Sequence, residues 1–232
     1  MMNQTTLTER MSSEPLLVED TLLLLFQPAS GTIAGENTLF YVLGGAVLAD
    51  LALAGRIEIE QKKLSVRVHA VGDGAMPDTL LDPAWEYISE KPRDVQSVLA
   101  AVGPELRGPV IDRLTARGDL HQEKGRTLGI FPSTKISLGS DRRSTLMAPV
   151  KAALLEGDSP APRTAASVAL LSASGTLPQF HPEIPWSGDV YTRGKVLEQG
   201  DWGASAAASA VARTMNAVVI NAVIAGTVLP RL

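Results

Sequence analysis

The segment that decides the fold is Leu48–Ile57, LADLALAGRI, which returns 63 positions later as Ile111–Leu120, IDRLTARGDL. In both copies a helical pattern ends at a glycine, Gly55 or Gly118, and a strand-like segment follows. Glycine ends helices readily because it adopts the left-handed backbone conformation without steric cost. A helix that runs into a β-hairpin is typical of a winged-helix-like unit. The repeat therefore predicts a helical scaffold that carries hairpins.

A first hairpin is predicted at Arg56–Val68, and a second one in the chain after Gly118. In the first, apolar and polar residues alternate on both sides of the polar turn Gln61–Lys63. The second copy alternates less clearly, and Thr127–Leu138 is expected to form a hairpin or a long exposed arm.

Helices are predicted for most of the remaining chain. They are expected at Glu14–Phe26, Leu39–Ala54, Ala84–Ile88, Val95–Val102, Pro109–Arg117, Thr145–Glu156, Arg163–Ser174, Asp189–Gln199 and Ala204–Leu229. Periodicity alone leaves a strand open for Leu22–Phe26. Ala204–Leu229 is expected to be a buried core helix and not a membrane span, because polar residues interrupt it. The proline-rich stretch Pro178–Gly188 is predicted to be a surface loop.

The predicted helix Leu39–Ala54 is apolar nearly all round, with Asp50 as its only charge. Such a helix is expected to lie in the middle of a core. Gly44 and Gly45 lie inside it with no strand before them, which favours close helix packing over a dinucleotide-binding turn.

The composition is that of a folded domain. Of the 232 residues, 45% are hydrophobic and 20% charged, which suffices for a core. No long linker divides the chain, so we expect one domain at residues 14–230 after a disordered tail at residues 1–13. The formal charge of −4 disfavours a protein that coats nucleic acid. Without cysteine, the chain has no disulfides, thiolate nucleophiles or cysteine-based zinc sites.

Motifs for catalysis are absent from the sequence. His69, His121 and His181 show no metal-ligand spacing, and neither a Gly-x-Ser-x-Gly elbow nor a phosphate-binding Gly-Lys-Ser/Thr triplet occurs. We therefore expect no enzyme, no cofactor and no metal.

Positive charge gathers in the middle of the chain. Between Glu105 and Lys151 there are nine basic and five acidic residues, although the whole chain is negative. Two interpretations stay open: a solvated face with neutralising pairs, such as Asp112 beside Arg113, or an anion-binding surface. Each basic side chain near an anionic membrane contributes about 1 kcal/mol.

The second arm adds an apolar tip to these charges. Leu128, Ile130 and Phe131 lie between Arg126 and Lys135. Apolar side chains flanked by cations suit shallow insertion into a membrane. The alternative is that the three apolar residues pack on the core or on a second copy of the chain.

At these residues the chain resembles the Golgi phosphoprotein 3 family, and most closely a bacterial branch of it. The most specific stretches are Leu43–Ile57, Asp78–Asp82 and Leu114–Leu120 with the arm that follows. Members of this family are peripheral membrane proteins that bind phosphatidylinositol 4-phosphate and, in eukaryotes, help retain Golgi glycosyltransferases. The resemblance implies a mainly α protein: a single globular helical domain with winged-helix-like helix–hairpin repeats and a protruding β-hairpin.

The resemblance also implies where a lipid headgroup would bind. The family pocket uses a tryptophan before the central helix, an arginine in a Leu-Arg-Gly step and an Arg-x-x-Arg pair. Here Gly35–Phe40 has no tryptophan, the step reads Leu43-Gly44-Gly45, and Pro104–Arg107 keeps only Arg107. Arg107 is thus expected to contact a headgroup phosphate. Leu128, Ile130 and Phe131 are expected to insert into the membrane or to form an oligomer.

The function expected from residues and resemblance together is that of a non-catalytic, cytoplasmic protein that associates peripherally with anionic phospholipid. It would form homo-oligomers through the hairpin and could act as an adaptor for protein clients. One alternative is a winged-helix nucleic-acid binder with Val110–Arg117 as recognition helix, using Arg113 and Arg117. Another is a protein–protein scaffold that binds no lipid.

Overall fold

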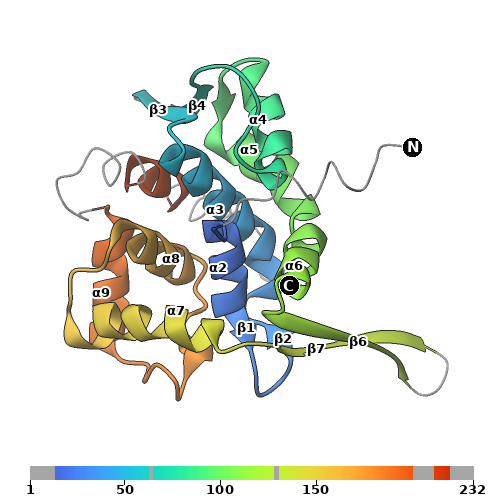
Figure 1. The fold of residues 1–232 in the computed structure, drawn as a ribbon. Coiled ribbons are helices and arrows are strands. Elements are labelled where there is room, and N and C mark those ends of the chain that lie inside the picture. Colours follow the sequence, from blue (N-terminus) through green and yellow to red (C-terminus); the bar gives the residue numbers. More distant parts are fainter. Residues whose placement is uncertain (1–13, 63–64, 128–130, 201–211, 220–232) are drawn as a thin grey trace, which may run out of the picture.

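Helix α3 (Leu39–Leu53) lies at the centre of the fold, in contact with α2, α5, α6 and α8. The computed structural model describes residues 14–62, 65–127, 131–200 and 212–219. Figure 1 shows helices gathered around α3, with one long β-hairpin that extends from the body. The mainly α architecture with a protruding hairpin is thereby confirmed.

The elements follow one another as helices interrupted by short antiparallel strand pairs. The α-helices besides α3 are α2 (Leu17–Leu25), α4 (Asp82–Ser89), α5 (Val95–Val102), α6 (Arg107–Ala116), α7 (Arg142–Lys151), α8 (Pro162–Ala173) and α9 (Gly188–Glu198). Short 3-10 turns are η1 (Glu36–Thr38), η2 (Thr79–Leu81), η3 (Gly103–Glu105) and η5 (Leu177–Phe180), and η4 (Ala152–Glu156) is a π-helix. The strands are β1 (Phe26–Gln27), β2 (Thr32–Ile33), β3 (Ile57–Lys62), β4 (Ser65–Ala70), β5 (Arg93–Asp94), β6 (Leu120–Thr127) and β7 (Phe131–Leu138).

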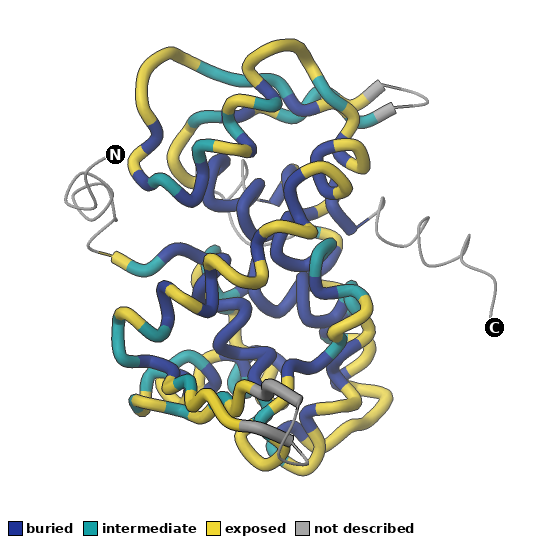
Figure 2. The backbone as a smooth tube through the Cα atoms, turned by 90° about the vertical axis from the view of Figure 1, so that its right-hand side faces the viewer, coloured by how far each residue is buried: buried dark blue, intermediate teal, exposed yellow. Residues whose placement is uncertain are grey.

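Burial explains why α3 can be apolar on every side. The stretch Glu36–Leu53 is long and apolar enough to cross a membrane by length and composition, but 67% of it is buried inside the protein. Figure 2 shows the buried backbone segments gathered in the interior. Gly44 and Gly45 pack closely, as predicted: a Cβ on Gly44 would lie 3.1 Å from Leu99, and one on Gly45 would lie 2.7 Å from Val218.

The sequence repeat is a repeat of backbone structure. Gly55 and Gly118 both have a left-handed backbone, with φ of 65° and 78°. The residue after each glycine donates its N–H to the carbonyl oxygen five residues earlier. The two bonds, Arg56 N to Leu51 O and Asp119 N to Leu114 O, are both 2.8 Å long and correspond under the 63-residue shift. The prediction of two helices that end at glycine and lead into hairpins is confirmed.

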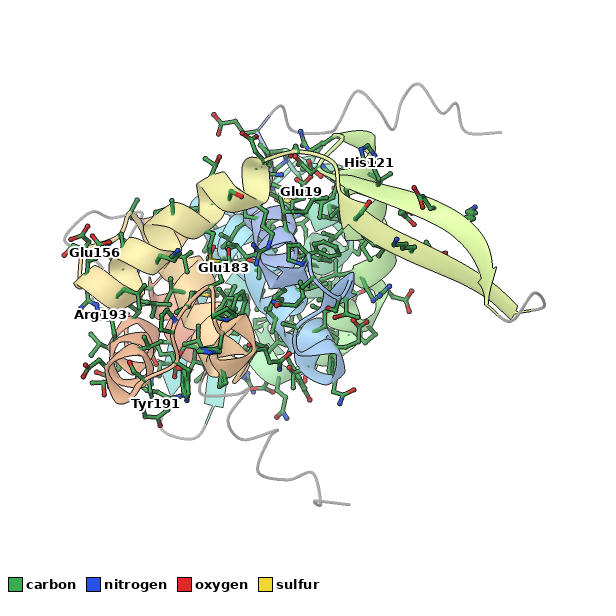
Figure 3. All side chains as sticks on the ribbon, turned by 90° about the horizontal axis from the view of Figure 1, so that it is seen from below. Glu19, His121, Glu156, Glu183, Tyr191 and Arg193 are labelled. Carbon is green, nitrogen blue, oxygen red and sulfur yellow. The ribbon has the colours of Figure 1, made fainter. Side chains whose placement is uncertain are left out.

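The second hairpin begins earlier than predicted. Strands β6 and β7 pair from Leu120↔Leu138 to Thr127↔Phe131, so the hairpin starts at Leu120 and not at Thr127. Its polar first strand gave no alternating pattern because most of its described side chains are exposed on a ribbon that stands away from the body. Figure 3 shows His121 at the base of this hairpin and Tyr191 of α9 on the other side of the body.

Several local predictions need correction. The strand alternative for Leu22–Phe26 is wrong up to Leu25, where α2 ends. The predicted surface loop Pro178–Gly188 includes part of η5 and buries Phe180 and Ile184, because these apolar side chains pack into the core.

The structure describes the two ends of the chain only in part. Residues 212–219 are helical, with Met215 and Val218 buried, in agreement with a core helix over that part of Ala204–Leu229. The rest of that predicted helix and the predicted tail at residues 1–13 lie outside the described residues.

Candidate functional site

Three separate segments of the sequence meet around one surface pocket. The pocket has a volume of about 260 Å³ and lies where the start of α3 faces η3 and the start of α6. Its wall is lined by Glu36, Leu39, Phe40, Leu43, Gly103, Pro104 and Arg107. All of these residues except Gly103 come from the three segments that the family resemblance singled out, so the fold brings the expected positions together.

Glycine at position 103 lets η3 approach α3 this closely. A Cβ on Gly103 would lie 2.2 Å from the backbone oxygen of Phe40, closer than atoms can pack. Both residues line the pocket, so the distance between these two backbones sets its width.

Gly103→Ala should therefore widen the pocket and lower the free energy of unfolding by about 1–3 kcal/mol, the usual cost of overpacking. Chemical denaturation would measure the loss. Gly108→Ala is the matched control, because a Cβ on Gly108 meets no atom within 4 Å and alanine favours a helix. Equal stability of the two variants would contradict the close approach.

Arg107 and Glu36 form an ion pair at the pocket. The Nε of Arg107 donates to Oε1 of Glu36 at 2.5 Å, and the two side chains are 48% and 51% exposed. They are the only charged residues in the described lining of the pocket, whose formal charge is therefore zero. The remaining lining side chains are apolar.

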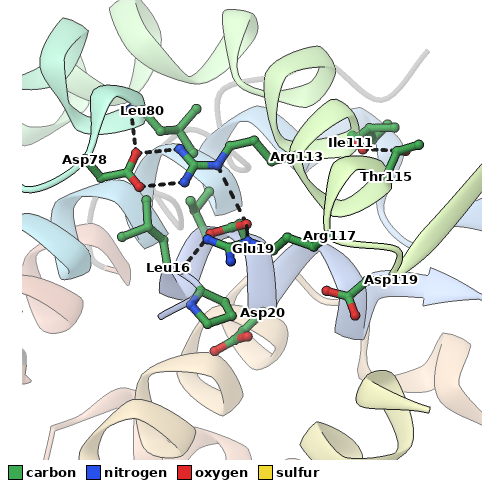
Figure 4. A network of polar contacts seen from close by, with 12 residues as sticks. Leu16, Glu19, Asp20, Asp78, Leu80, Ile111, Arg113, Thr115, Arg117 and Asp119 are labelled. Atoms are coloured by element: carbon green, nitrogen blue, oxygen red, sulfur yellow. Dashed lines mark hydrogen bonds and ion pairs between the residues drawn. The ribbon is translucent and has the colours of Figure 1, made fainter. Parts of the chain in front are cut away.

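The other arginines of the basic window are mostly occupied inside the protein. Arg113 binds both carboxylate oxygens of Asp78 and lies 3.7 Å from Glu19. Figure 4 shows these groups pointing toward one another between α6, η2 and α2. Burial alone would lower the pKa of Arg113, but the hydrogen bonds that Arg113 donates to Asp78 and the charges of Glu19 and Asp78 raise it. The expected pairing of Arg113 with Asp112 is wrong.

Arg117, Arg142 and Arg143 are likewise occupied by contacts inside the protein. Arg117 donates to Glu19 at 2.7 Å, and Arg142 pairs with both Asp20 and Asp119. Arg143 is 3% exposed and donates to the Phe26 carbonyl and to Glu183, which Figure 3 labels. These four arginines make contacts inside the protein, so they do not form a broad cationic face.

Exposed lysines remain on the hairpin. Lys124 of β6 and Lys135 of β7 are both exposed. Of the predicted tip residues, Leu128 and Ile130 lie outside the described residues, and Phe131 begins β7 opposite Thr127. Insertion or self-association of this tip stays a prediction.

A second, larger pocket was not predicted from the sequence. It has a volume of about 560 Å³ and is lined mainly by apolar residues of η2, α4, α5 and the start of α6, among them Leu80, Tyr87 and Leu106. No motif marks it, because its residues are typical of helix packing. Its one cation, Arg113, is already bound to Asp78.

No group of three or more histidine, aspartate or glutamate side chains in the described part of the chain could hold a metal ion. His69 lies 3.1 Å from Oε2 of Glu60 across the β3–β4 hairpin. The arrangement of the site points to binding of a small charged group at an apolar pocket.

Comparison with known families gives one match. The family model described as Golgi phosphoprotein 3 (GPP34) matches residues 17–214, which include the pocket, both repeats and the hairpin. A search among curated proteins finds no match.

Proposed function

The chain belongs to the Golgi phosphoprotein 3 family, and we propose that it is a non-catalytic protein that lies on a membrane and binds the phosphate of a phospholipid headgroup through Arg107. Membership of the family suggests a lipid-binding role. The observation that carries the proposal for this chain is the pocket itself, where an arginine lies beside an apolar wall.

The two kinds of surface in the pocket fit the two parts of a phospholipid. A guanidinium forms strong hydrogen bonds to phosphate because both are charged. Leu39, Phe40 and Leu43 offer apolar surface next to Arg107, where the glycerol and upper acyl chain would lie. Removing such apolar area from water contributes about 25 cal/mol per Å².

The hairpin supplies the second contact in this proposal. It extends from the body (Figure 1), and the exposed Lys124 and Lys135 would face headgroups if its tip touched the membrane. Anchoring by one weak contact is reversible, and a second contact or a second copy of the chain strengthens it. Self-association through the hairpin would therefore assist membrane binding.

The winged-helix alternative is disfavoured by the state of its proposed recognition helix. Arg113 is 8% exposed and holds Asp78, and Arg117 holds Glu19. A recognition helix needs such side chains free to reach base edges. No comparable observation favours DNA binding.

Sedimentation with vesicles tests the role of Arg107. On vesicles that contain phosphatidylcholine, phosphatidylethanolamine and phosphatidylglycerol, Arg107→Glu should weaken binding about thirtyfold, because it replaces an attraction of about 1 kcal/mol by a repulsion of similar size. Arg67→Glu is the matched control, since Arg67 is 46% exposed and forms a 4.0 Å ion pair with Asp94 away from the pocket.

The control separates the possible outcomes. Strong loss for Arg107→Glu alone supports the proposal. Equal loss for both variants would contradict a specific role of Arg107 and indicate attraction by overall charge. No binding of the natural chain to any vesicle would contradict the membrane role and favour the protein–protein scaffold.

A further inference from the structure

We propose that the pocket selects a headgroup that carries both a phosphate and a primary ammonium, with Arg107 binding the phosphate and Glu36 binding the ammonium. This inference rests on the proposed function and names the chemical class of its ligand. It starts from the observation that the pocket presents one cation and one anion side by side.

The charge of the pocket argues against a polyanionic headgroup. A ligand with several negative charges would occupy the space next to the carboxylate of Glu36, and like charges in contact cost several kcal/mol. The rest of the described lining is uncharged, so no second cation compensates. A zwitterion satisfies both groups at once, and discrimination of this kind arises as much from repulsion of the wrong ligand as from attraction of the right one.

The ion pair is placed where a ligand can open it. Its two side chains are about half exposed, whereas Arg113 and Asp78 are 10% and 0% exposed. An exposed pair contributes only about 0–1 kcal/mol, so exchanging it for two ligand contacts costs little. A buried pair such as Arg113–Asp78 cannot be exchanged in this way, because each separated charge would stay out of water.

The positions of Glu36 and Arg107 at the pocket also support a zwitterionic headgroup. Glu36 opens η1 on one side of the pocket and Arg107 opens α6 on the other, 71 residues apart in sequence. Leu39 and Phe40, which follow η1 at the start of α3, line the same pocket. A zwitterionic headgroup would thus replace the Arg107–Glu36 contact with one contact to each side chain, with its apolar part over Leu39 and Phe40.

Vesicle sedimentation with three compositions tests the inference: phosphatidylcholine alone, and phosphatidylcholine mixed with either phosphatidylethanolamine or phosphatidylglycerol. The natural chain should bind the ethanolamine mixture most strongly, about fivefold better than the glycerol mixture, as expected for one ion pair of about 1 kcal/mol. Phosphatidylcholine should bind less, because its quaternary ammonium cannot donate a hydrogen bond to Glu36.

Glu36→Gln should remove this preference and improve binding to the phosphatidylglycerol vesicles. Glu90→Gln is the matched control: Glu90 also pairs with an arginine at 2.5 Å, is 70% exposed, and lies outside the described lining of the pocket. The two variants change the net charge equally. A shift in headgroup preference for Glu36→Gln alone supports the inference, and an equal shift for both variants overturns it.

Competition with soluble headgroups separates this inference from the membrane role. Glycerophosphoethanolamine should displace the protein from vesicles, and glycerophosphoglycerol should do so about fivefold less well. Equal competition by both would overturn the inference but leave membrane binding intact. If nuclear magnetic resonance detected glycerophosphoethanolamine binding while no vesicle bound, the zwitterion site would be supported and the membrane role contradicted.

Discussion

Replacing Arg113 with methionine should lower the free energy of unfolding by about 3–5 kcal/mol, the usual cost of removing one partner from a buried ion pair. The carboxylate of Asp78 is fully buried and would lose the positive charge of Arg113. Glu19 is also fully buried, but it would keep Arg117 at 2.7 Å and the backbone N–H of Leu16 at 2.7 Å. The main loss would therefore come from Asp78, and urea denaturation would measure it.

Two further variants make this expectation specific. Arg67→Met removes an exposed arginine from a 4.0 Å pair and should cost less than about 1 kcal/mol. The double variant Asp78→Asn with Arg113→Met leaves no isolated charge, and an asparagine oxygen can still accept the N–H of Leu80, as Asp78 does at 2.8 Å. It should recover much of the stability. A double variant as unstable as Arg113→Met would contradict the view that the buried charge of Asp78, deprived of Arg113, causes the loss.

The repeat could be predicted from the sequence because its signals are local. A glycine at the end of a helix commonly adopts the left-handed backbone conformation, and both Gly55 and Gly118 do so. The start of the second hairpin could not be placed, because an exposed two-stranded ribbon needs no alternation of apolar and polar residues. Its extent comes from backbone pairing between Leu120 and Leu138.

The pairing of charges could not be predicted in the same way. Adjacent residues in a helix point in different directions, so the sequence neighbours Asp112 and Arg113 do not form a pair. The partner of Arg113 is Asp78, 35 residues away. Arg107 was named from a family resemblance. Its partner Glu36, 71 residues away, has no sequence signal, because only the fold brings η1 next to α6.

The sequence repeat nevertheless contains one signal of the buried charged contacts around α2. Under the 63-residue shift, Asp50 of α3 corresponds to Arg113 of α6. Both helices contact α2, and each directs a buried charged side chain to the first turn of that helix: Asp50 to the N–H groups of Leu17 and Val18, Arg113 to Glu19. A buried charge at the same position of the two repeated helices thus marks a shared partner, helix α2.

Asp50 ties the stability of the protein to pH, and we expect the free energy of unfolding to fall as the pH rises from 3.8 to about 7. Burial raises the pKa of Asp50 from 3.8 to about 7, although the hydrogen bonds from Leu17 and Val18 and the charge of Arg163 favour the ionised form. In this range the folded protein holds a proton that the unfolded chain has released. Stability from this group is complete below the unfolded pKa and is lost as the pH passes the folded one.

Between pH 3.8 and about 7, the free energy of unfolding should fall by about 4 kcal/mol because of Asp50. Burial also raises the pKa of Asp20, which adds to the fall in the same direction. Urea denaturation at several pH values would show the decline, and the dependence on Asp50 would correspond to about one proton released on unfolding.

Asp50→Asn isolates the contribution of Asp50, because asparagine stays neutral at every pH while one oxygen still accepts a backbone N–H. Its profile should be flatter than that of the natural chain, and Asp94→Asn, which removes a carboxylate at 53% side-chain exposure, is the matched control. Asp50→Ala should cost about 3 kcal/mol at low pH, because two buried N–H groups lose their acceptor. If Asp50→Asn kept the full decline, the pH dependence would have to come from other groups, and Asp50 would act only as the cap of α2.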